Sequence, residues 1–350
     1  MKVLPDTKLD FIDVLIHPRR SKLSSRSQVD LEREFRFKNS NQTWKGVPIM
    51  TSNMDTIGTF EMYQVLSKYK MITCLHKHYT IEDYLKVTAE GGLNREYYML
   101  STGISKREWD KLGELIKLLN PKFVCVDVAN GYMFEFAKFV KRLHEAYPEI
   151  VITCGNVVSR EMVEELIINC GADIVKVGIG SGSCCTTRIQ TGVGMPQLSA
   201  VMECSDAAHG VGGCIISDGG IKNAGDVAKA FGGGADFVMM GSVLAGHDES
   251  GGEVVEIDGE KIKIFYGMSS NTAMDKYHGG VAKYRSSEGK TVKVKYRGPV
   301  ENTINNMLGG VRSTCTYIGA KRMKDMAKCT TFLRVNRQVN TIYNGREVKK

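Results

Sequence analysis

Eight short apolar segments recur along residues 47–246, and each ends in glycine or polar residues. They are VPIMTSNMD (47–55), MITCLHKH (71–78), YYMLSTG (97–103), FVCVDVANG (123–131), IVITCGNV (150–157), IVKVGIG (174–180), CIISDGG (214–220) and FVMMGSVLAG (237–246). Between them lie segments such as EFAKFVKRLHEAY, whose apolar residues recur every three or four positions, as on one face of a helix. Continuous apolar strands that alternate with helices are typical of a parallel sheet buried on both faces.

Eight strand–helix units predict an α/β fold in which the sheet closes into a (β/α)8 TIM barrel. An open doubly wound sheet is the alternative, but no GxGxxG motif follows the first strand, as a nucleotide-binding sheet of that kind would require. The 350 residues fit one barrel domain. We expect an N-terminal extension under or beside the barrel (1–46), the eight units (47–246), a hairpin and flap (247–299), and a closing helix with a C-terminal tail (300–350).

The segment after the eighth strand breaks the alternation. Residues 253–267, EVVEIDGEKIKIFYG, alternate apolar and polar side chains around Asp258-Gly259, which predicts a β-hairpin. Residues 280–300 are polar and basic, and a long excursion of this kind is usually a functional lid or disordered. Residues 300–320 return to a helical pattern that can close the eighth unit.

Composition excludes several classes of function. No stretch of 18 apolar residues occurs, so no membrane-spanning segment is expected. The net charge of +8 fits spread surface lysines or attraction to phosphorylated ligands, and no basic run is interleaved with aromatic residues as in nucleic-acid-binding proteins. Ten cysteines without a CxxC pair indicate a reducing compartment and no zinc or thioredoxin-type motif. Because the N-terminus also lacks the layout of a signal peptide, we expect a cytoplasmic protein.

Active-site groups of these barrels lie at the C-terminal ends of the strands. Polar residues and glycines at those positions are Asn53, Asp55, Lys77, Asp127, Asn130, Asn156, Gly178, Gly180, Asp218, Gly219, Gly220, Gly241 and Ser242. Any one of them could merely cap a helix. Glycine turns after both the seventh and the eighth strand, however, are typical of a phosphate site built from backbone N–H groups. The pattern therefore predicts a phosphorylated small-molecule ligand.

The loop GIGSGSCCTTR (178–188) sets two adjacent cysteines among glycines. A glycine-rich loop can present a thiolate nucleophile without burying it, although a turn with two structural thiols has the same sequence. Spacing alone leaves both interpretations open. Thr187 and Glu288 are candidates for proton transfer if the polar excursion folds over this loop.

The motifs GIGxGSxCTTR, SDGG, FVMMG, GMSS and YRxSEGK, in this order, resemble the inosine monophosphate (IMP) dehydrogenase/GMP reductase family. The resemblance extends from LDFIDVLIHPRRSKLSSRSQVDL to TTFLRV, nearly the whole chain. The dehydrogenases usually carry a CBS-domain pair after the second strand, whereas about twenty residues separate HKHY from YYMLSTG here. The segments CLHKHYT, DVANGY, AKAFGGGADFVMMGSVLAG and RSTCTYIGA also resemble the reductase branch, with the dehydrogenase as the alternative.

The resemblance implies an oxidoreductase that converts GMP to IMP with NADPH and releases ammonia, in purine interconversion and salvage. The family's nucleophile directly precedes the two threonines, which assigns it to Cys185 and leaves Cys184 to packing. Thr187 and Glu288 would move protons, and Cys185 would carry a covalent thioimidate. Ser181 departs from the family's usual proline, which predicts a looser loop.

The resemblance also implies binding residues. GMP would contact Asp218, Gly219, Gly220, Gly241, Ser242, Gly267, Met268, Ser269, Arg285, Ser286, Ser287, Glu288 and Gly289. NADPH would contact Lys77, Asp127, Val128, Ala129, Ile179, Gly180, Met268, Tyr284 and Arg285, and also Ser25, Arg26, Ser313, Thr314, Cys315 and Thr316 of a neighbouring subunit in a homotetramer. A monovalent cation, potassium, would be held at Gly180, Gly182, Cys185 and Arg188.

Two other classes remain as alternatives at this stage. A flavin-dependent barrel oxidoreductase would use the same phosphate turns but has no need of the CCTTR loop. An RNA-binding role would rest on the basic charge alone.

Overall fold

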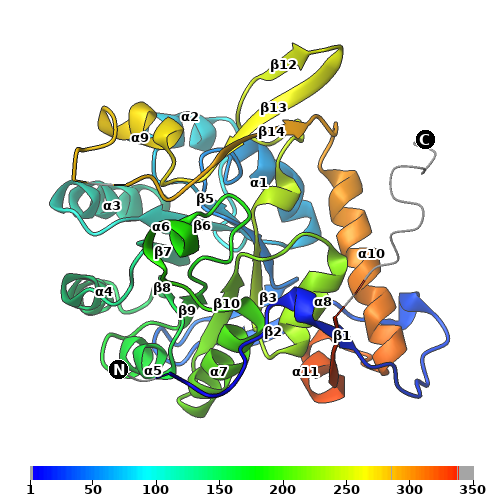
Figure 1. The fold of residues 1–350 in the computed structure, drawn as a ribbon. Helices are drawn as coiled ribbons and strands as arrows, with labels where there is room; N and C mark the ends of the chain where they lie inside the picture. Colours follow the sequence, from blue (N-terminus) through cyan, green and yellow to red (C-terminus); the bar gives the residue numbers. More distant parts are fainter. Residues whose placement is uncertain (1–2, 285, 337, 339–350) are drawn as a thin grey trace.

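Eight parallel strands form the centre of the molecule in the computed structural model, which describes residues 3–284, 286–336 and 338 (Figure 1). They are β4 (Ile49–Thr51), β5 (Thr73–Leu75), β6 (Tyr98–Thr102), β7 (Phe123–Asp127), β8 (Val151–Val157), β9 (Ile174–Val177), β10 (Cys214–Asp218) and β11 (Phe237–Met240). Consecutive strands pair in parallel, β11 returns to β4, and a bridge between Met50 and Ile72 joins β4 to the start of β5. The predicted (β/α)8 barrel is confirmed, and the open sheet is wrong.

Helices connect the strands, most of them on the outside of the barrel and α6 at its rim. They are α1 (Phe60–Leu66), α2 (Ile81–Ala89), α3 (Lys106–Leu119), α4 (Phe134–Ala146), α5 (Arg160–Ile168), α6 (Thr187–Thr191), α7 (Gln197–Gly210), α8 (Ala224–Gly232) and α10 (Glu301–Ile318). Side-chain caps fix several starts: Thr59, Thr80, Ser105 and Asn223 accept hydrogen bonds from the first turns of α1, α2, α3 and α8. The longer step between the sixth and seventh strands contains both α6 and α7.

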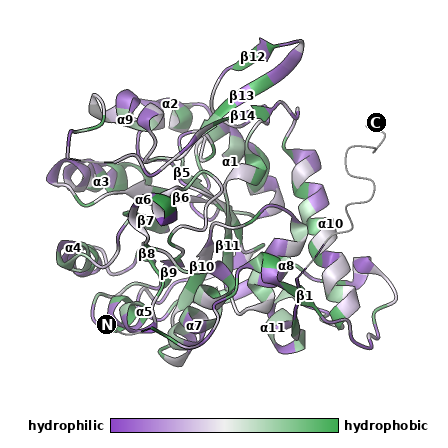
Figure 2. Cartoon of the chain, in the orientation of Figure 1, coloured by the Kyte–Doolittle hydropathy of each residue, from purple (hydrophilic) through white to green (hydrophobic). Residues whose placement is uncertain are grey.

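Two apolar cores lie on the two faces of the sheet. One is inside the barrel, and the other lies between the strands and the surrounding helices. The strands are therefore apolar on both sides, whereas the helices carry both apolar and polar residues (Figure 2). This arrangement explains the continuous apolar runs in the sequence.

The N-terminal extension closes one end of the barrel. Its antiparallel pair β2 (Arg33–Arg36) and β3 (Thr43–Gly46) places Phe35 and Trp44 against the interior residues Phe237 and Phe123. The Phe35 and Phe237 rings stack with their centroids 4.5 Å apart. An early and a late segment of the chain meet beside this region, since β1 (Val14–Ile16) pairs with β15 (Phe332–Arg334). Because this end is filled with aromatic side chains, a ligand can enter the barrel only at the opposite rim.

The insertion after the eighth strand is more ordered than the sequence predicted. The hairpin β12 (Val254–Ile257) and β13 (Glu260–Tyr266) turns at Asp258 and Gly259, both with positive φ, as a two-residue hairpin turn requires. The sequence did not predict a third strand, β14 (Thr291–Lys295), or helix α9 (Asn271–His278). We call residues 253–299 the flap; in Figure 1 its sheet projects above the barrel rim.

Short elements complete the chain. They are the helix α11 (Met326–Cys329) and the 3-10 helices η1 (Phe11–Asp13), η2 (Arg26–Gln28), η3 (Ser67–Tyr69), η4 (Ser242–Leu244) and η5 (Met323–Asp325). The predicted closing helix is α10, and the rest of the predicted tail, 339–350, lies outside the described residues. Among the helices that the structure describes, none combines the length and the apolar character needed to cross a bilayer.

Candidate active site

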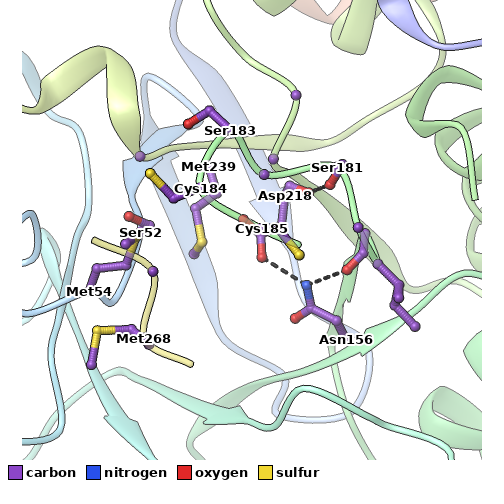
Figure 3. A pocket seen from close by; sticks show the side chains of 18 of the residues that line it. Ser52, Met54, Asn156, Ser181, Ser183, Cys184, Cys185, Asp218, Met239 and Met268 are labelled. Atoms are coloured by element: carbon purple, nitrogen blue, oxygen red, sulfur yellow. Dashed lines mark hydrogen bonds between the residues drawn. The ribbon is translucent and has the colours of Figure 1, made fainter. Parts of the chain in front are cut away.

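A cavity of about 290 Å³ opens at the C-terminal ends of the strands (Figure 3). This volume is at the lower end of the range for small-molecule sites. Most residues that the sequence placed in the site line it: Asp127, Val128, Ala129, Ile179, Gly180, Gly182, Cys185, Thr187, Asp218, Gly219, Gly220, Gly241, Ser242, Gly267, Met268, Ser269 and Glu288. Six separate segments of the barrel rim and the flap therefore converge on one cavity.

The flap lies directly on the cysteine loop. Glu288 N–H donates to the Ser269 carbonyl at 3.0 Å, and its own carbonyl accepts from Thr186 N–H at 2.9 Å. The next backbone bond joins Lys290 N–H to the Cys184 carbonyl at 2.8 Å. These bonds make a short antiparallel bridge between Cys185 and Gly289. The polar excursion thus folds over the loop, the condition on which the proton-transfer hypothesis depended.

A chain of two hydrogen bonds leads from a thiol to a carboxylate. The Cys185 Sγ donates to Thr187 Oγ1 at 3.2 Å, and Thr187 Oγ1 donates to Glu288 Oε2 at 2.7 Å. All three side chains line the cavity and are partly buried. A hydroxyl can accept one proton while donating another, so this chain can carry the thiol proton away from sulfur.

The two adjacent cysteines lie in different environments. Cys184 is buried, and burial raises the pKa of its thiol, which keeps the thiol protonated. Cys185 is partly exposed to the cavity and has the Thr187 hydroxyl beside it. The geometry therefore favours Cys185 as the nucleophile and Cys184 as packing.

Glycines let the cysteine loop approach the turn after β10. A Cβ on Gly178 would lie 2.1 Å from the Asp218 carbonyl oxygen, and one on Gly219 would lie 2.4 Å from Ser181 Oγ. Gly219 and Gly220 also have φ of 89° and 80°, where side chains are strained. Ser181 donates to the Asp218 carbonyl at 2.8 Å (Figure 3). Ser181 therefore ties the loop to β10, whereas its departure from the family's proline predicts a looser loop.

The floor of the cavity holds a buried charge cluster that the sequence analysis missed. Lys176 Nζ lies 2.7 Å from Asp127 Oδ1 and 2.8 Å from Asp218 Oδ2. Burial by itself lowers the pKa of Lys176, but the two carboxylates outweigh this effect and hold the pKa well above its ordinary value. Burial likewise raises the pKa of Asp127, but Lys176 reverses that effect and lowers it overall. The signal in the sequence was a single lysine within the apolar strand IVKV.

The chain is similar to known proteins along nearly its whole length. A family model described as "IMP dehydrogenase / GMP reductase domain" matches residues 8–341. The chain belongs to this family. A GMP reductase of Salmonella newport (strain SL254) is 59% identical over 349 residues, covering 99% of this chain and 100% of the relative. A GMP reductase of Salmonella arizonae has the same identity and coverage. As a member of the IMP dehydrogenase/GMP reductase family, the chain is an enzyme, an oxidoreductase.

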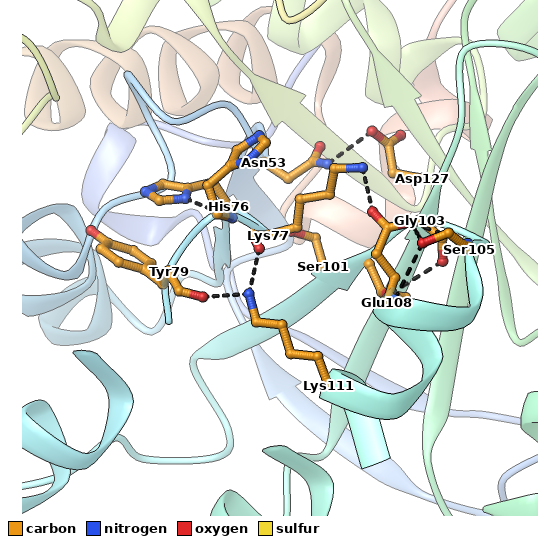
Figure 4. Close-up of polar contacts among 12 residues, drawn as sticks. Asn53, His76, Lys77, Tyr79, Ser101, Gly103, Ser105, Glu108, Lys111 and Asp127 are labelled. Atoms are coloured by element: carbon orange, nitrogen blue, oxygen red, sulfur yellow. Dashed lines mark hydrogen bonds and ion pairs between the residues drawn. The ribbon is translucent and has the colours of Figure 1, made fainter. Parts of the chain in front are cut away.

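Lys77, a cofactor candidate from the family resemblance, lies beside the cavity without lining it (Figure 4). Its Nζ forms an ion pair with Glu108 Oε1 at 2.5 Å, in a small hollow lined by α2, the end of β6 and α3. Burial raises the pKa of Glu108, but Lys77 outweighs burial and lowers it overall. Asp127, the neighbouring candidate, is held by Asn53 Nδ2 at 2.9 Å. The ammonium group of Lys77 is therefore already paired in this structure.

Other residues that the family resemblance assigned lie away from the cavity lining. Tyr284 is 94% exposed, and Arg285 lies outside the described residues. Neither Arg188 nor Ser286, Ser287 and Gly289 of the flap line the cavity. Ser287 Oγ donates to the carbonyls of Ser269 and Gly289, which shapes the flap turn.

The residues assigned to a neighbouring subunit gather on a different part of the chain. Ser25 and Arg26 lie at η2, which packs on α10, the helix that contains residues 313–316. Ser313, Thr314 and Thr316 are partly exposed, whereas the Cys315 side chain is fully buried and its thiol pKa is raised to about 12 by burial. The Cys315 thiol therefore packs in the core of the chain.

The cation ligands that the family resemblance implies include backbone carbonyls of the cysteine loop. Within the described residues, the carbonyl of Gly182 accepts from Cys185 N–H at 3.1 Å, and no hydrogen bond reaches the carbonyls of Gly180 and Cys185. Uncommitted carbonyl oxygens are ligands that suit a hard cation. Arg188 donates to Asp10 Oδ2 at 3.0 Å and to the Met195 carbonyl at 2.7 Å, so its guanidinium braces the loop.

Proposed function

We propose that the enzyme reduces GMP to IMP with NADPH and releases ammonia through a covalent intermediate on Cys185. The observation that carries this proposal is the hydrogen-bonded chain from Cys185 through Thr187 to Glu288, on a cavity that also contains the glycine turns after β10 and β11. The similarity to proteins named GMP reductase supports the choice of substrate.

The first half-reaction is a displacement at C2 of the guanine ring. The Cys185 thiol loses its proton to the Thr187–Glu288 pair, and the sulfur forms a bond to C2. The same pair returns the proton to the 2-amino group, the C2–N bond breaks, and ammonia departs. The product is a thioimidate that joins Cys185 to the purine. Covalent catalysis of this kind replaces one difficult displacement with two easier steps.

The second half-reaction releases the product. NADPH, when bound, supplies a hydride to C2. The sulfur–carbon bond then breaks, Cys185 leaves as a thiolate, and IMP is formed. The chain's own contribution is to place Asp127, Val128 and Met268 on the same cavity as Cys185, so that the cofactor and the purine share one space. Exclusion of water by the flap protects the intermediate from hydrolysis.

The nucleotide would bind with its phosphate at the turns after β10 and β11. Backbone N–H groups of Gly219, Gly220, Gly241 and Ser242 would take the phosphate, and the Asp218 carboxylate would take ribose hydroxyls. Residues 267–269 and 286–289 of the flap would cover the base. Lys222 also lines the cavity and adds a positive charge near the turn.

Further parts of the proposal concern the cofactor and the assembly. The carbonyls of Gly180, Gly182 and Cys185 would hold potassium, which would fix the shape of the loop. A homotetramer would bring Ser25, Arg26 and the exposed face of residues 313–316 to the cofactor of a neighbouring subunit. The reaction would serve purine salvage in the cytoplasm.

The direct test mixes the purified protein with GMP and NADPH. We expect loss of reduced-nicotinamide absorbance together with equal amounts of IMP and ammonia. Absence of ammonia release while NADPH is consumed would contradict the proposal. Oxidation of IMP with an oxidised nicotinamide cofactor, faster than GMP reduction, would favour the dehydrogenase alternative. Flavin absorbance of the purified protein would support a flavin enzyme, and salt-dependent binding of random RNA would support a role in RNA binding.

A further inference from the structure

Lys176 lies at the centre of a row of polar side chains across the cavity floor. Its side chain is 4% exposed, and its ammonium bridges Asp127 at the end of β7 and Asp218 at the end of β10. Asn53 Nδ2 holds the other oxygen of Asp127 at 2.9 Å, and Asn156 Nδ2 donates to Asp218 Oδ2 at 2.8 Å. A buried lysine is retained at a strand position when its charge is paired, and here two carboxylates pair it.

The bonds to Asp218 leave one of its oxygens available. Both Lys176 and Asn156 bind Oδ2, whereas within the described residues no hydrogen bond reaches Oδ1. Asp218 lines the cavity and keeps 20% of its side chain exposed. The two donors on Oδ2 therefore fix the carboxylate plane and leave Oδ1 as the acceptor for a ligand hydroxyl.

We propose that Lys176 is a positioning residue that orients Asp218 to recognise the ribose hydroxyls of the nucleotide. This inference rests on the proposed function, which assigns the ribose to Asp218. It goes further because the preference for ribose over 2′-deoxyribose would depend on a lysine that need not contact the nucleotide. Through Asp127, the same ammonium joins the nucleotide side of the cavity to the side assigned to the cofactor.

The test compares GMP with 2′-deoxyGMP. Loss of a hydrogen bond to a charged group typically costs about 10- to 100-fold in specificity. We expect the wild-type enzyme to prefer GMP by this factor in kcat/KM, and Lys176→Met to reduce the preference to less than about threefold. Lys176→Arg keeps the charge and the donors, so it should retain most of the preference.

Lys222→Met is the matched control. Lys222 also lines the cavity but makes no ion pair with a carboxylate within the described residues. Removal of the Lys222 charge should weaken the binding of GMP and of 2′-deoxyGMP equally, so the preference for GMP should stay unchanged. Should Lys176→Met fail to fold, the double variant Lys176→Met/Asp127→Asn removes the buried ammonium together with one of its two carboxylate partners, and the preference must fall in that protein as well.

An unchanged GMP preference in a folded Lys176 variant that still reduces GMP would overturn the inference and leave the proposed function intact. A wild-type enzyme that treats both nucleotides alike would also overturn it. A wild-type enzyme that does not reduce GMP would instead refute the proposed function, and calorimetric binding of both nucleotides to wild type and Lys176→Met would still test the inference on its own.

Discussion

Thr187 Oγ1 donates a 2.7 Å hydrogen bond to the carboxylate of Glu288, a residue 101 positions further along the chain. The bond exists because the flap returns to the cysteine loop and pairs with it at Cys185 and Gly289. Thr187 also accepts the thiol proton of Cys185, so one hydroxyl joins the nucleophile to a carboxylate. The whole catalytic proposal depends on this contact between two distant segments.

Glu288→Gln should stop deamination while leaving GMP binding in place. Glutamine keeps the hydrogen bond from Thr187 but is a far weaker base, and loss of an acid–base group typically lowers the rate by about 100- to 10,000-fold. Single-turnover measurements with deuterated NADPH should show no isotope effect, since the block precedes hydride transfer. A full isotope effect in this variant would refute the proton-relay role. Glu256→Gln, an exposed carboxylate of β12, is the matched control.

Cys185→Ala should abolish turnover, whereas Cys184→Ala should retain it. Both cysteines line the cavity, but Cys185 is partly exposed and donates to Thr187, whereas Cys184 is buried and contributes packing. The Cys184 variant should lose about 1 kcal/mol of stability, as is typical of a small change in the core. Steady-state rates and thermal melts measure the two effects. Activity in Cys185→Ala beside an inactive Cys184→Ala would reverse the assignment.

Asp55→Asn should loosen the flap. The buried Asp55 carboxylate at the end of β4 accepts hydrogen bonds from Tyr266, Tyr277 and Lys276 of the flap. Weakening these charge-assisted bonds should cost about 1–3 kcal/mol of docking energy. The KM for GMP should therefore rise, and amide exchange in residues 260–295 should accelerate. Asp248→Asn, at the exposed contact with Tyr296, should change neither quantity measurably.

The docking of the flap should also depend on pH in one direction. Burial raises the pKa of Asp55, but its three donors outweigh burial and set the pKa below its ordinary value. The stabilisation is therefore fully present above the unfolded pKa of about 3.9 and is lost as the pH falls through the lower native value. Exchange protection of the flap should be constant from about pH 5 to 8. Loss of protection within that range would show that another group controls docking.

The enzyme should prefer NADPH to NADH, and Lys77→Met should reduce that preference. Lys77 lies next to the candidate cofactor residue Asp127 and is paired with Glu108. When NADPH binds, the Lys77 ammonium would contact both Glu108 and the phosphate that NADPH has and NADH lacks. Glu108→Gln should release Lys77 and strengthen NADPH binding. The ratio of kcat/KM for the two cofactors measures this effect. Equal efficiency with both cofactors in the wild type would contradict the prediction.

The barrel and most of the site were predictable because they depend on local patterns. All eight apolar runs became strands, and the glycine turns after β10 and β11 line the cavity, because strand ends converge at one rim in this fold. The hairpin was predictable because Asp258-Gly259 is a residue pair that favours a two-residue turn, and both residues have positive φ in the structure.

The remaining features depend on contacts between distant segments. Strand β14 has an alternating pattern, but its partner β13 is separated from it in the sequence by α9, which docks on Asp55. The role of Lys176 depends on two carboxylates from other strands, which no spacing in the sequence reveals. The sequence predicts a contact between Thr187 and Glu288 only if the flap folds over the cysteine loop. In the structure the flap does fold over this loop, and the two side chains form a hydrogen bond.

The most direct test of the central claim is the mass of the enzyme quenched in acid during turnover of GMP and NADPH. The account predicts an adduct equal to GMP minus ammonia, on the peptide that contains Cys185 and on no peptide of the Cys185→Ala variant. It also predicts that the adduct decays to IMP when NADPH is in excess. Steady release of IMP and ammonia from an enzyme that never carries this adduct would contradict the account.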